Sequence, residues 1–237
     1  MESTVQGRFK DMETSDSKNI DQRFAYPNWQ GPFVWYGGTD AEIKLENDYV
    51  VIDVETTGLD AGQGARVIEL SAIRTDGTGV ALDSMTTLLN PKVESTGAEF
   101  IHGISLGMID SAPTFGDIWP QLAKLFSGAI FVAHHAKFDE SFIASEAKIA
   151  NIDLGVMPGL CTYRLAKDSV TVTPNHKLAT LSAHYGLDSG VIHSAYDDAL
   201  TVVQLLPHLL AVSGELNHYA KTFIYEGGPV STKLCQR

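Results

Sequence analysis

Short apolar runs alternate with longer segments in which apolar residues recur at helical spacing. The runs at 49–55, 66–74, 80–89 and 129–133 are rich in β-branched and other apolar residues, which predicts strands. The turn-forming sequence Thr75-Asp76-Gly77-Thr78-Gly79 predicts a hairpin between the second and third strands. Apolar positions three and four residues apart predict helices at 105–109, 115–127, 139–149, 161–167, 177–186 and 194–212.

A three-strand meander followed by alternating helices and strands predicts an α/β fold, with a mixed sheet flanked by helices. The chain has 237 residues, which is enough to bury a sizeable core in one domain. Its 44% hydrophobic and 19% charged residues are typical of globular proteins. The longest helical pattern, at 194–212, contains Pro207, so we expect an interruption or a kink there.

The two ends of the chain differ in composition from residues 48–212, which we predict to form the main domain. Residues 1–22 are polar with mixed charges, and we expect a flexible tail. Residues 23–47 hold six aromatic residues among Pro and Gly, which favours an arm that packs on the domain or on a partner chain. A base-stacking platform is the alternative for this arm. Residues 213–237 form a C-terminal extension.

Carboxylates interrupt the apolar stretches at a few positions. Asp53 and Glu55 are two residues apart on the strand at 49–55, so their side chains lie on the same face of it. Two carboxylates on one face repel each other, and Mg²⁺ or Mn²⁺ offsets that repulsion because both ions prefer oxygen ligands. A strand end at which both acids reach water is the alternative. The sequence Thr56-Thr57-Gly58 ends the strand with small residues, which lets a ligand approach the backbone closely.

Three further residues occupy places where strands end or helices begin. Asp139 follows the strand at 129–133, where it is either a site residue or an ordinary acid of the first helical turn. Asp198 and Asp197 are adjacent on the helix at 194–212, and adjacent helical side chains point about 100° apart, so only one of them faces the site. His193 precedes this helix, and a surface or capping histidine is its alternative. Taken together, four carboxylates and one histidine predict a two-metal site that cuts phosphodiester bonds.

These segments resemble the three motifs of the DEDDh family of 3′–5′ exonucleases, which includes the proofreading subunit of bacterial DNA polymerase III. The motifs D-x-E-T-T-G, H-N-A-x-F-D and H-x-A-x-x-D-A correspond to Asp53–Gly58, His134–Asp139 and His193–Ala199, and the resemblance covers residues 48–212. His135 stands where the family usually has Asn, which bears on substrate positioning more than on activity. Ser194, four residues before Asp198, excludes the tyrosine subclass of these enzymes.

The resemblance implies an RNase H-like fold and a metal-dependent phosphodiesterase. Such an enzyme releases nucleoside 5′-monophosphates from the 3′ end of single-stranded DNA or RNA. Two Mg²⁺ or Mn²⁺ ions would be held by Asp53, Glu55, Asp139 and Asp198. His193 would be the general base, because imidazole titrates near neutral pH. Contacts to the terminal nucleotide would come from Thr57, Gly58, Leu59 and His102.

The formal net charge of −12 is unfavourable for gripping long nucleic acids. It predicts shallow engagement of a short 3′ end, or affinity supplied by a partner such as a polymerase or another replication or repair protein. A phosphodiesterase for short oligonucleotides is therefore one alternative. A catalytically silent binding module with the exonuclease fold is another, although all five catalytic positions are intact.

The remaining sequence features concern location. No apolar run of about 18 residues exists, so no membrane span is expected. The polar N-terminus lacks the apolar core of a signal peptide. Cys161 and Cys235 are far apart and form no metal-binding motif. These features predict a reduced, cytoplasmic protein.

Overall fold

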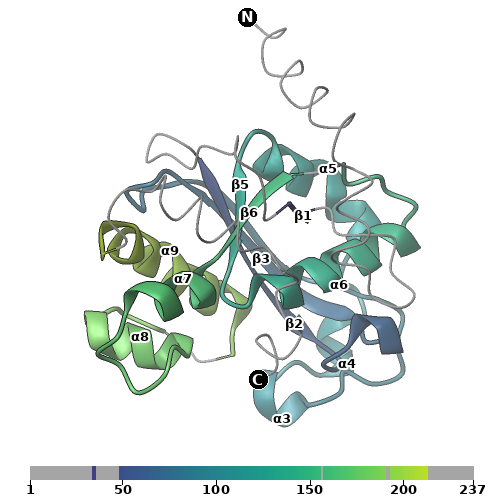
Figure 1. Cartoon of the computed structure of the whole chain (residues 1–237). Helices are drawn as coiled ribbons and strands as arrows, with labels where there is room; N and C mark the ends of the chain where they lie inside the picture. The colour runs from purple at the N-terminus through teal and green to yellow at the C-terminus, as the bar shows by residue number, and fades with distance from the viewer. Residues whose placement is uncertain (1–33, 36–47, 156, 191–192, 213–237) are drawn as a thin grey trace, which may run out of the picture.

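A six-stranded sheet in the order β1-β6-β5-β2-β3-β4 forms the centre of the molecule, with helices on both faces (Figure 1). The computed structural model describes residues 34–35, 48–155, 157–190 and 193–212. The strands are β1 Val34–Trp35, β2 Tyr49–Thr56, β3 Val67–Thr75, β4 Ala81–Leu88, β5 Ile130–Ala133 and β6 Met157–Cys161. The helices are α3 Glu99–His102, α4 Leu106–Ile109, α5 Phe115–Phe126, α6 Ala136–Ile149, α7 Thr162–Ser169, α8 Leu178–Tyr185 and α9 Ala195–Val212, with a 3₁₀ turn, η1, at Ala61–Gln63.

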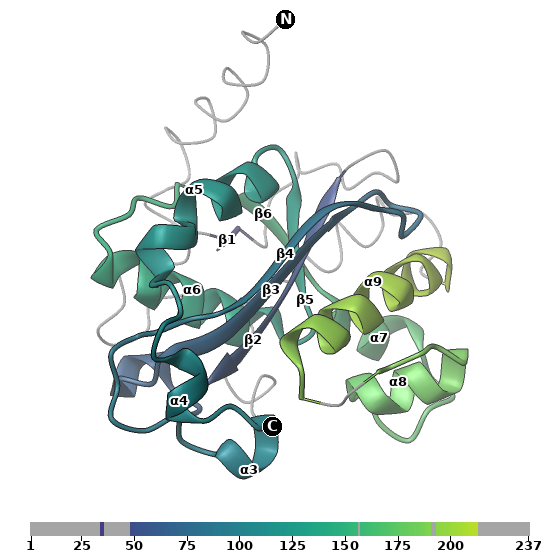
Figure 2. The same cartoon turned by 180° about the vertical axis from the view of Figure 1, so that it is seen from behind.

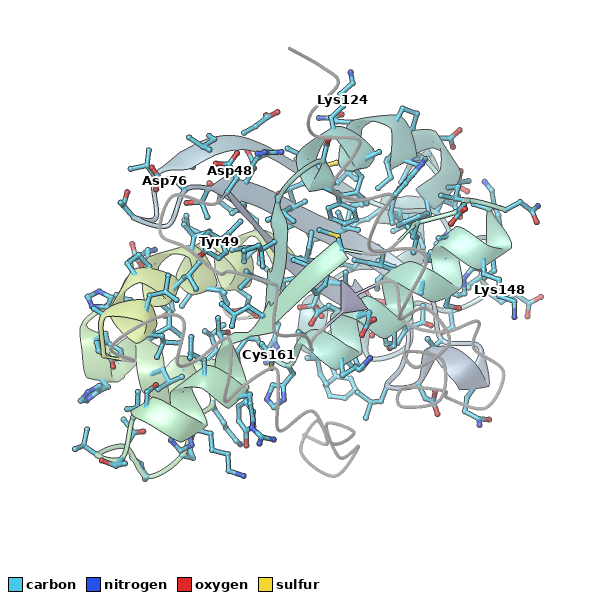
Figure 3. The ribbon with its side chains drawn as sticks, turned by 45° about the horizontal axis from the view of Figure 1, so that its top comes forward. Asp48, Tyr49, Asp76, Lys124, Lys148 and Cys161 are labelled. Carbon is cyan, nitrogen blue, oxygen red and sulfur yellow. The ribbon has the colours of Figure 1, made fainter. Side chains whose placement is uncertain are left out.

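The predicted meander and mixed sheet are confirmed. Strands β2, β3 and β4 pair antiparallel in sequence, whereas β5 joins β2 in parallel and β6 joins β5 in parallel. In the hairpin turn, a carboxylate oxygen of Asp76 accepts the backbone N–H groups of Thr78 and Val80 at 2.9 and 3.1 Å. At the opposite end of the meander from the candidate site, Arg74 binds Asp48 at 2.6 Å, and Figure 3 shows Asp48 and Tyr49 beside each other there.

The two faces of β2 belong to different cores. Val50, Ile52 and Val54 pack with α5 and α6, whereas Tyr49 and Val51 pack with α7, α8 and α9. Figure 2 shows these two groups of helices on opposite sides of the sheet. Because strand side chains alternate between faces, the stripe that begins with Tyr49 and Val51 continues into Asp53 and Glu55. One face of β2 therefore changes from apolar to acidic along its length.

Helix α9 covers this face with a continuous apolar stripe. Its fully buried residues recur three and four positions apart, as an amphipathic helix requires, and include Ala195, Ala199, Val202, Leu206 and Leu209. The helix continues through Pro207 to Val212 as one element. Gly79 of the β3–β4 hairpin packs against that proline, since a Cβ at Gly79 would lie 3.0 Å from Cγ of Pro207.

The sequence did not predict β6 or α3, and it placed the start of α6 at residue 139 instead of Ala136. Strand β6 contains Pro158 and Gly159, which have low strand propensity, and it forms because it pairs with β5 in the sheet. Strand β1 pairs with β6 and is the described part of the predicted arm. The predictions for 1–22, for the rest of 23–47 and for 213–237 fall outside the described residues.

None of the helices in the described part of the chain is long and apolar enough to cross a membrane.

Candidate active site

The acidic half of β2 lies where two parallel strands end. Asp53 and Glu55 are partly buried, and Val54 between them points into the opposite core with 3% of its surface exposed. Val51 pairs with Val132 of β5, so β5 ends close to the level of Asp53. The carboxyl ends of parallel strands are the usual place for sites in α/β sheets.

Helix α9 places its N-terminal end over this acidic half. Atoms of Glu55, His193 and Asp198 that could bind a metal lie within 4.8 Å of one another, and we call these three residues the metal-ligand group, whether a member binds the ion or acts beside it. Glu55 and Asp198 are partly buried, and His193 is exposed. Two ligands on opposite sides of a Mg²⁺ ion are about 4 Å apart, so the spacing of the two carboxylates is compatible with both binding one ion. Carboxylate oxygens are the donors that Mg²⁺ and Mn²⁺ prefer, so the group fits such an ion.

Asp197, the neighbour of Asp198, packs against a different segment. A Cβ on Gly190 would lie only 2.4 Å from Oδ1 of Asp197, so this carboxylate lies against the loop that precedes His193. The loop is held on the same side of α9 by Gln204, whose side chain donates to the carbonyl of Asp188 at 3.2 Å. Of the two adjacent aspartates, Asp198 is therefore the one whose carboxylate reaches the metal-ligand group.

Asp139 lies in the first turn of α6, directly after β5, with 3% of its surface exposed. The turn begins at His135, whose φ of 76° is in the left-handed region. Asn, Asp and His tolerate this conformation better than most residues, which gives a backbone reason for His at a position where Asn is usual in the resembling family. Asp53 and Asp139 are outside the 4.8 Å group, so their binding of metal remains a prediction.

His134 joins the end of β5 to two later segments. Its Nε2 lies 2.9 Å from the carbonyl oxygen of His176 and its Nδ1 lies 3.0 Å from Oγ1 of Thr162. A carbonyl oxygen can only accept, so Nε2 carries a proton. In the neutral ring Nδ1 then accepts from the hydroxyl of Thr162, in preference to the longer contact of that hydroxyl with the carbonyl of Ala133 at 3.4 Å. Burial lowers the pKa of His134 to about 3, so the ring is neutral at physiological pH.

This depressed pKa predicts that the fold loses stability as the pH falls. An unfolded histidine has a pKa near 6.5, so below that pH the unfolded chain binds a proton that folded His134 refuses. At pH 5 this difference in proton binding lowers the free energy of unfolding by about 2 kcal/mol. We expect the melting temperature to fall more between pH 7.5 and pH 5 in the wild type than in His134→Gln. Equal falls in thermal melts of both proteins would contradict this assignment.

Of the predicted nucleotide-binding residues, Thr57, Gly58 and Leu59 follow β2 directly, and His102 is the last residue of α3. The backbone N–H of Thr57 donates to the carbonyl of Arg66, and Oγ1 of Thr57 accepts the N–H of Arg66, both at 2.9 Å. Leu59 is 73% exposed, and a Cβ at Gly58 would meet Cβ of Ala65 at 3.3 Å. His102 accepts the N–H of Ile104 through Nδ1 at 3.0 Å, which leaves Nε2–H to donate to the carbonyl of Thr96. Their contacts to substrate remain predictions.

The side chain of Arg66 is held by an ion pair with Glu146 of α6. Its Nε and Nη2 each lie 2.8 Å from a carboxylate oxygen of Glu146, which is almost fully buried, and its Nη1 donates to the carbonyl of Pro91 at 3.0 Å. A buried bidentate ion pair holds both partners in one geometry. Arg66 therefore ties the loop that carries Thr57 to the body of the domain.

Glu69 of β3 lies beside Glu55 in the sheet, but no role in the site was predicted for it from the sequence. Its Oε2 accepts the backbone N–H of Ala195, the first residue of α9, at 3.1 Å. An acid inside the apolar run from Val67 to Ile73 is the same kind of pattern that marked Asp53 and Glu55. That pattern could have identified it, although its partner at Ala195 is too distant in sequence to infer.

The residues that match known proteins include the strands and helices that form this site. The family model described as Exonuclease, RNase_T, matches residues 50–206. A Mycobacterium tuberculosis protein named as a bifunctional exonuclease/endonuclease is 30% identical over 203 residues, which cover 81% of this chain but only 31% of that protein. The DNA polymerase III subunit epsilon of Aquifex aeolicus is 27% identical over 167 residues, which cover 70% of this chain and 82% of that protein.

The fold also matches that of a solved nuclease. The structure of Exonuclease X in complex with 5′ overhanging duplex DNA aligns with a TM-score of 0.58 and 21% identity, covering 76% of this chain and 99% of that one. At this level of identity the likeness extends to the fold.

Proposed function

This chain belongs to the RNase T family of exonucleases, related to the DEDDh enzymes and to DNA polymerase III epsilon, and from that membership we propose its reaction. We propose that it is a metal-dependent 3′–5′ exonuclease that releases nucleoside 5′-monophosphates from the 3′ end of single-stranded DNA or RNA. The observation that carries this proposal is the metal-ligand group, in which Glu55, His193 and Asp198 converge within 4.8 Å at the end of β2.

The proposed roles follow from position and chemistry. Glu55 and Asp198 hold divalent ions through their carboxylates, with Asp53 and Asp139 completing the set from β2 and α6. Bound Mg²⁺ or Mn²⁺ supplies positive charge that stabilises the phosphate during displacement and makes water more acidic. His193 is exposed beside both carboxylates, where a ring nitrogen would take the proton of the attacking water. Attack of the water oxygen at phosphorus breaks the bond to the 3′ oxygen of the preceding nucleotide. That oxygen takes a proton from solvent and becomes the new 3′-hydroxyl, and the terminal nucleotide is released as a nucleoside 5′-monophosphate.

Two exposed apolar side chains support a nucleic-acid substrate. Leu59 is 73% exposed and Phe100, on α3, is 90% exposed. The segment before α3 packs on the loop that carries Leu59, because a Cβ at Gly97 would lie 2.1 Å from the carbonyl oxygen of Thr57. An exposed aromatic ring such as that of Phe100 is a surface on which a base can stack, and Leu59 adds exposed apolar surface.

A panel of oligonucleotides tests the proposal. We expect Mn²⁺-dependent release of 5′-monophosphates from single-stranded substrates, with dissociation after few cleavages, because a net charge of −12 opposes retention of a long strand. The substrates are single-stranded DNA, duplex DNA, RNA and a dinucleotide, each 5′-labelled and assayed with and without EDTA.

Asp53→Ala prepared in parallel reveals any contaminating nuclease, and it should be inactive. A wild type without activity on every substrate would overturn the proposal in favour of a silent binding module. Faster cleavage of the dinucleotide than of long strands would instead support the phosphodiesterase for short oligonucleotides.

A further inference from the structure

We propose that Glu69 is a positioning residue, which holds the start of α9 at the distance from Glu55 that metal binding requires. The inference rests on the proposed metal-dependent function and adds to it a residue that binds neither metal nor substrate. Three observations carry it: the strand register, one hydrogen bond and the place of its donor in the chain.

The register places Glu69 directly beside a member of the metal-ligand group. Glu69 of β3 is paired with Glu55 of β2 in the antiparallel ladder. Residues directly opposite each other in such a ladder point to the same face, with Cβ atoms about 4.5–5.5 Å apart. Like charges at that spacing destabilise a sheet, so a second carboxylate here costs stability unless something else stabilises it.

The start of α9 supplies that stabilisation. The N–H of Ala195 donates to Oε2 of Glu69 at 3.1 Å, and Ala195 is fully buried. The first N–H groups of a helix have no acceptor within the helix, and a carboxylate near a helix N-terminus is favourable. The hydrogen bond therefore satisfies a buried donor that water does not reach.

The donor, Ala195, lies in the sequence between His193 and Asp198, two members of the metal-ligand group. Ala195 follows His193 by two residues and precedes Asp198 by three. The N–H of Asp198 donates to the carbonyl of Ser194 at 3.0 Å, so Asp198 moves together with the first turn. The hydrogen bond from Ala195 to Glu69 thus links the segment that carries His193 and Asp198 to the strand that pairs with β2 at Glu55.

Loss of this bond is expected to loosen the first turn without unfolding the helix. The rest of α9 stays packed on β2 and β3 through buried residues such as Val202, Leu206 and Leu209. The consequence should be a change in metal affinity and turnover, with little change in affinity for the oligonucleotide. Residues that orient metal ligands typically change metal affinity or activity by about 10–100-fold when they are removed.

Two variants distinguish the effect of losing the hydrogen bond from the effect of losing the charge. Glu69→Ala removes both, whereas Glu69→Gln removes only the charge. We expect Glu69→Ala to weaken Mn²⁺ binding about tenfold or more, measured by calorimetric titration of folded protein without substrate. The same variant should lower kcat while KM for a single-stranded oligonucleotide stays nearly unchanged. Glu69→Gln keeps an oxygen that can accept the N–H of Ala195, so its Mn²⁺ binding should remain close to that of the wild type.

Asp117→Ala is the matched control. Asp117 accepts the backbone N–H of Thr114 at 2.8 Å at the start of α5, which packs in the other core. Its removal should lower the melting temperature without changing Mn²⁺ binding. If Glu69→Ala behaves in the same way, or if Glu69→Gln loses Mn²⁺ affinity as Glu69→Ala does, the positioning role is overturned.

The binding measurement does not depend on turnover. A wild type that binds Mn²⁺ but cleaves no oligonucleotide would overturn the proposed function and leave the role of Glu69 standing. The two proposals can therefore fail separately.

Discussion

Asp198→Asn is expected to reduce cleavage by about 10³-fold or more. The substitution keeps the shape of the side chain and removes one of the two carboxylates that converge with His193. Loss of a charged ligand weakens binding of the ion and the charge stabilisation it supplies, which is worth several kcal/mol, and each 1.36 kcal/mol corresponds to a factor of ten in rate. Single-turnover rates on a 5′-labelled oligonucleotide at saturating Mn²⁺ measure the effect.

Asp197→Asn is the control for that experiment. The carboxylate of Asp197 packs against Gly190 and does not reach the group, so this variant should retain activity near that of the wild type. A ranking in which Asp197→Asn is the more damaging change would mean that the wrong member of the pair has been assigned to the metal.

His193→Ala is expected to lower kcat by about 10²–10⁴-fold, the usual contribution of a general base. His193 is the exposed member of the group, and it is followed closely by the first turn of α9. If it acts as the base, its removal should leave Mn²⁺ affinity nearly unchanged, because Glu55 and Asp198 remain. The pH dependence of the rate should also change, since the group that accepts the proton is gone.

Calorimetric Mn²⁺ titration alongside the rate measurement distinguishes a base from a ligand at this position. Loss of rate together with a large loss of Mn²⁺ affinity would show that His193 binds the ion directly, contrary to the base assignment. His184→Ala, which removes an exposed histidine on α8, controls for the loss of an imidazole elsewhere on the surface.

The strand positions of the site could be predicted from sequence because they depend on local periodicity. Alternation along β2 was sufficient to place Asp53 and Glu55 on one face, and that face is the one α9 covers. Helical geometry was sufficient to predict that only one of Asp197 and Asp198 faces the site. It could not decide which by itself; the family motif named Asp198, and in the structure the carboxylate of Asp197 lies against the loop at Gly190.

The features that were not predicted depend on contacts distant in sequence. Strand β6 has weak strand propensity and exists because Gly159 and Leu160 pair with Phe131 and Val132. Helix α6 begins before the residue where its apolar spacing becomes clear, because the backbone turns at His135. The bond between Glu69 and Ala195 joins residues more than a hundred positions apart. Local patterns carry no information about such pairs.

The change from apolar to acidic along one face of β2 has a thermodynamic consequence. The same helix buries the core residues of that face and places Asp198 at its acidic end, so the fold and the proposed metal site share one interface. An ion bound there stabilises the folded chain in proportion to the logarithm of its concentration above the dissociation constant. Conversely, we expect truncation of a buried side chain such as Leu206 to disturb the packing of α9 on β2 and to weaken metal affinity at the far end of the helix.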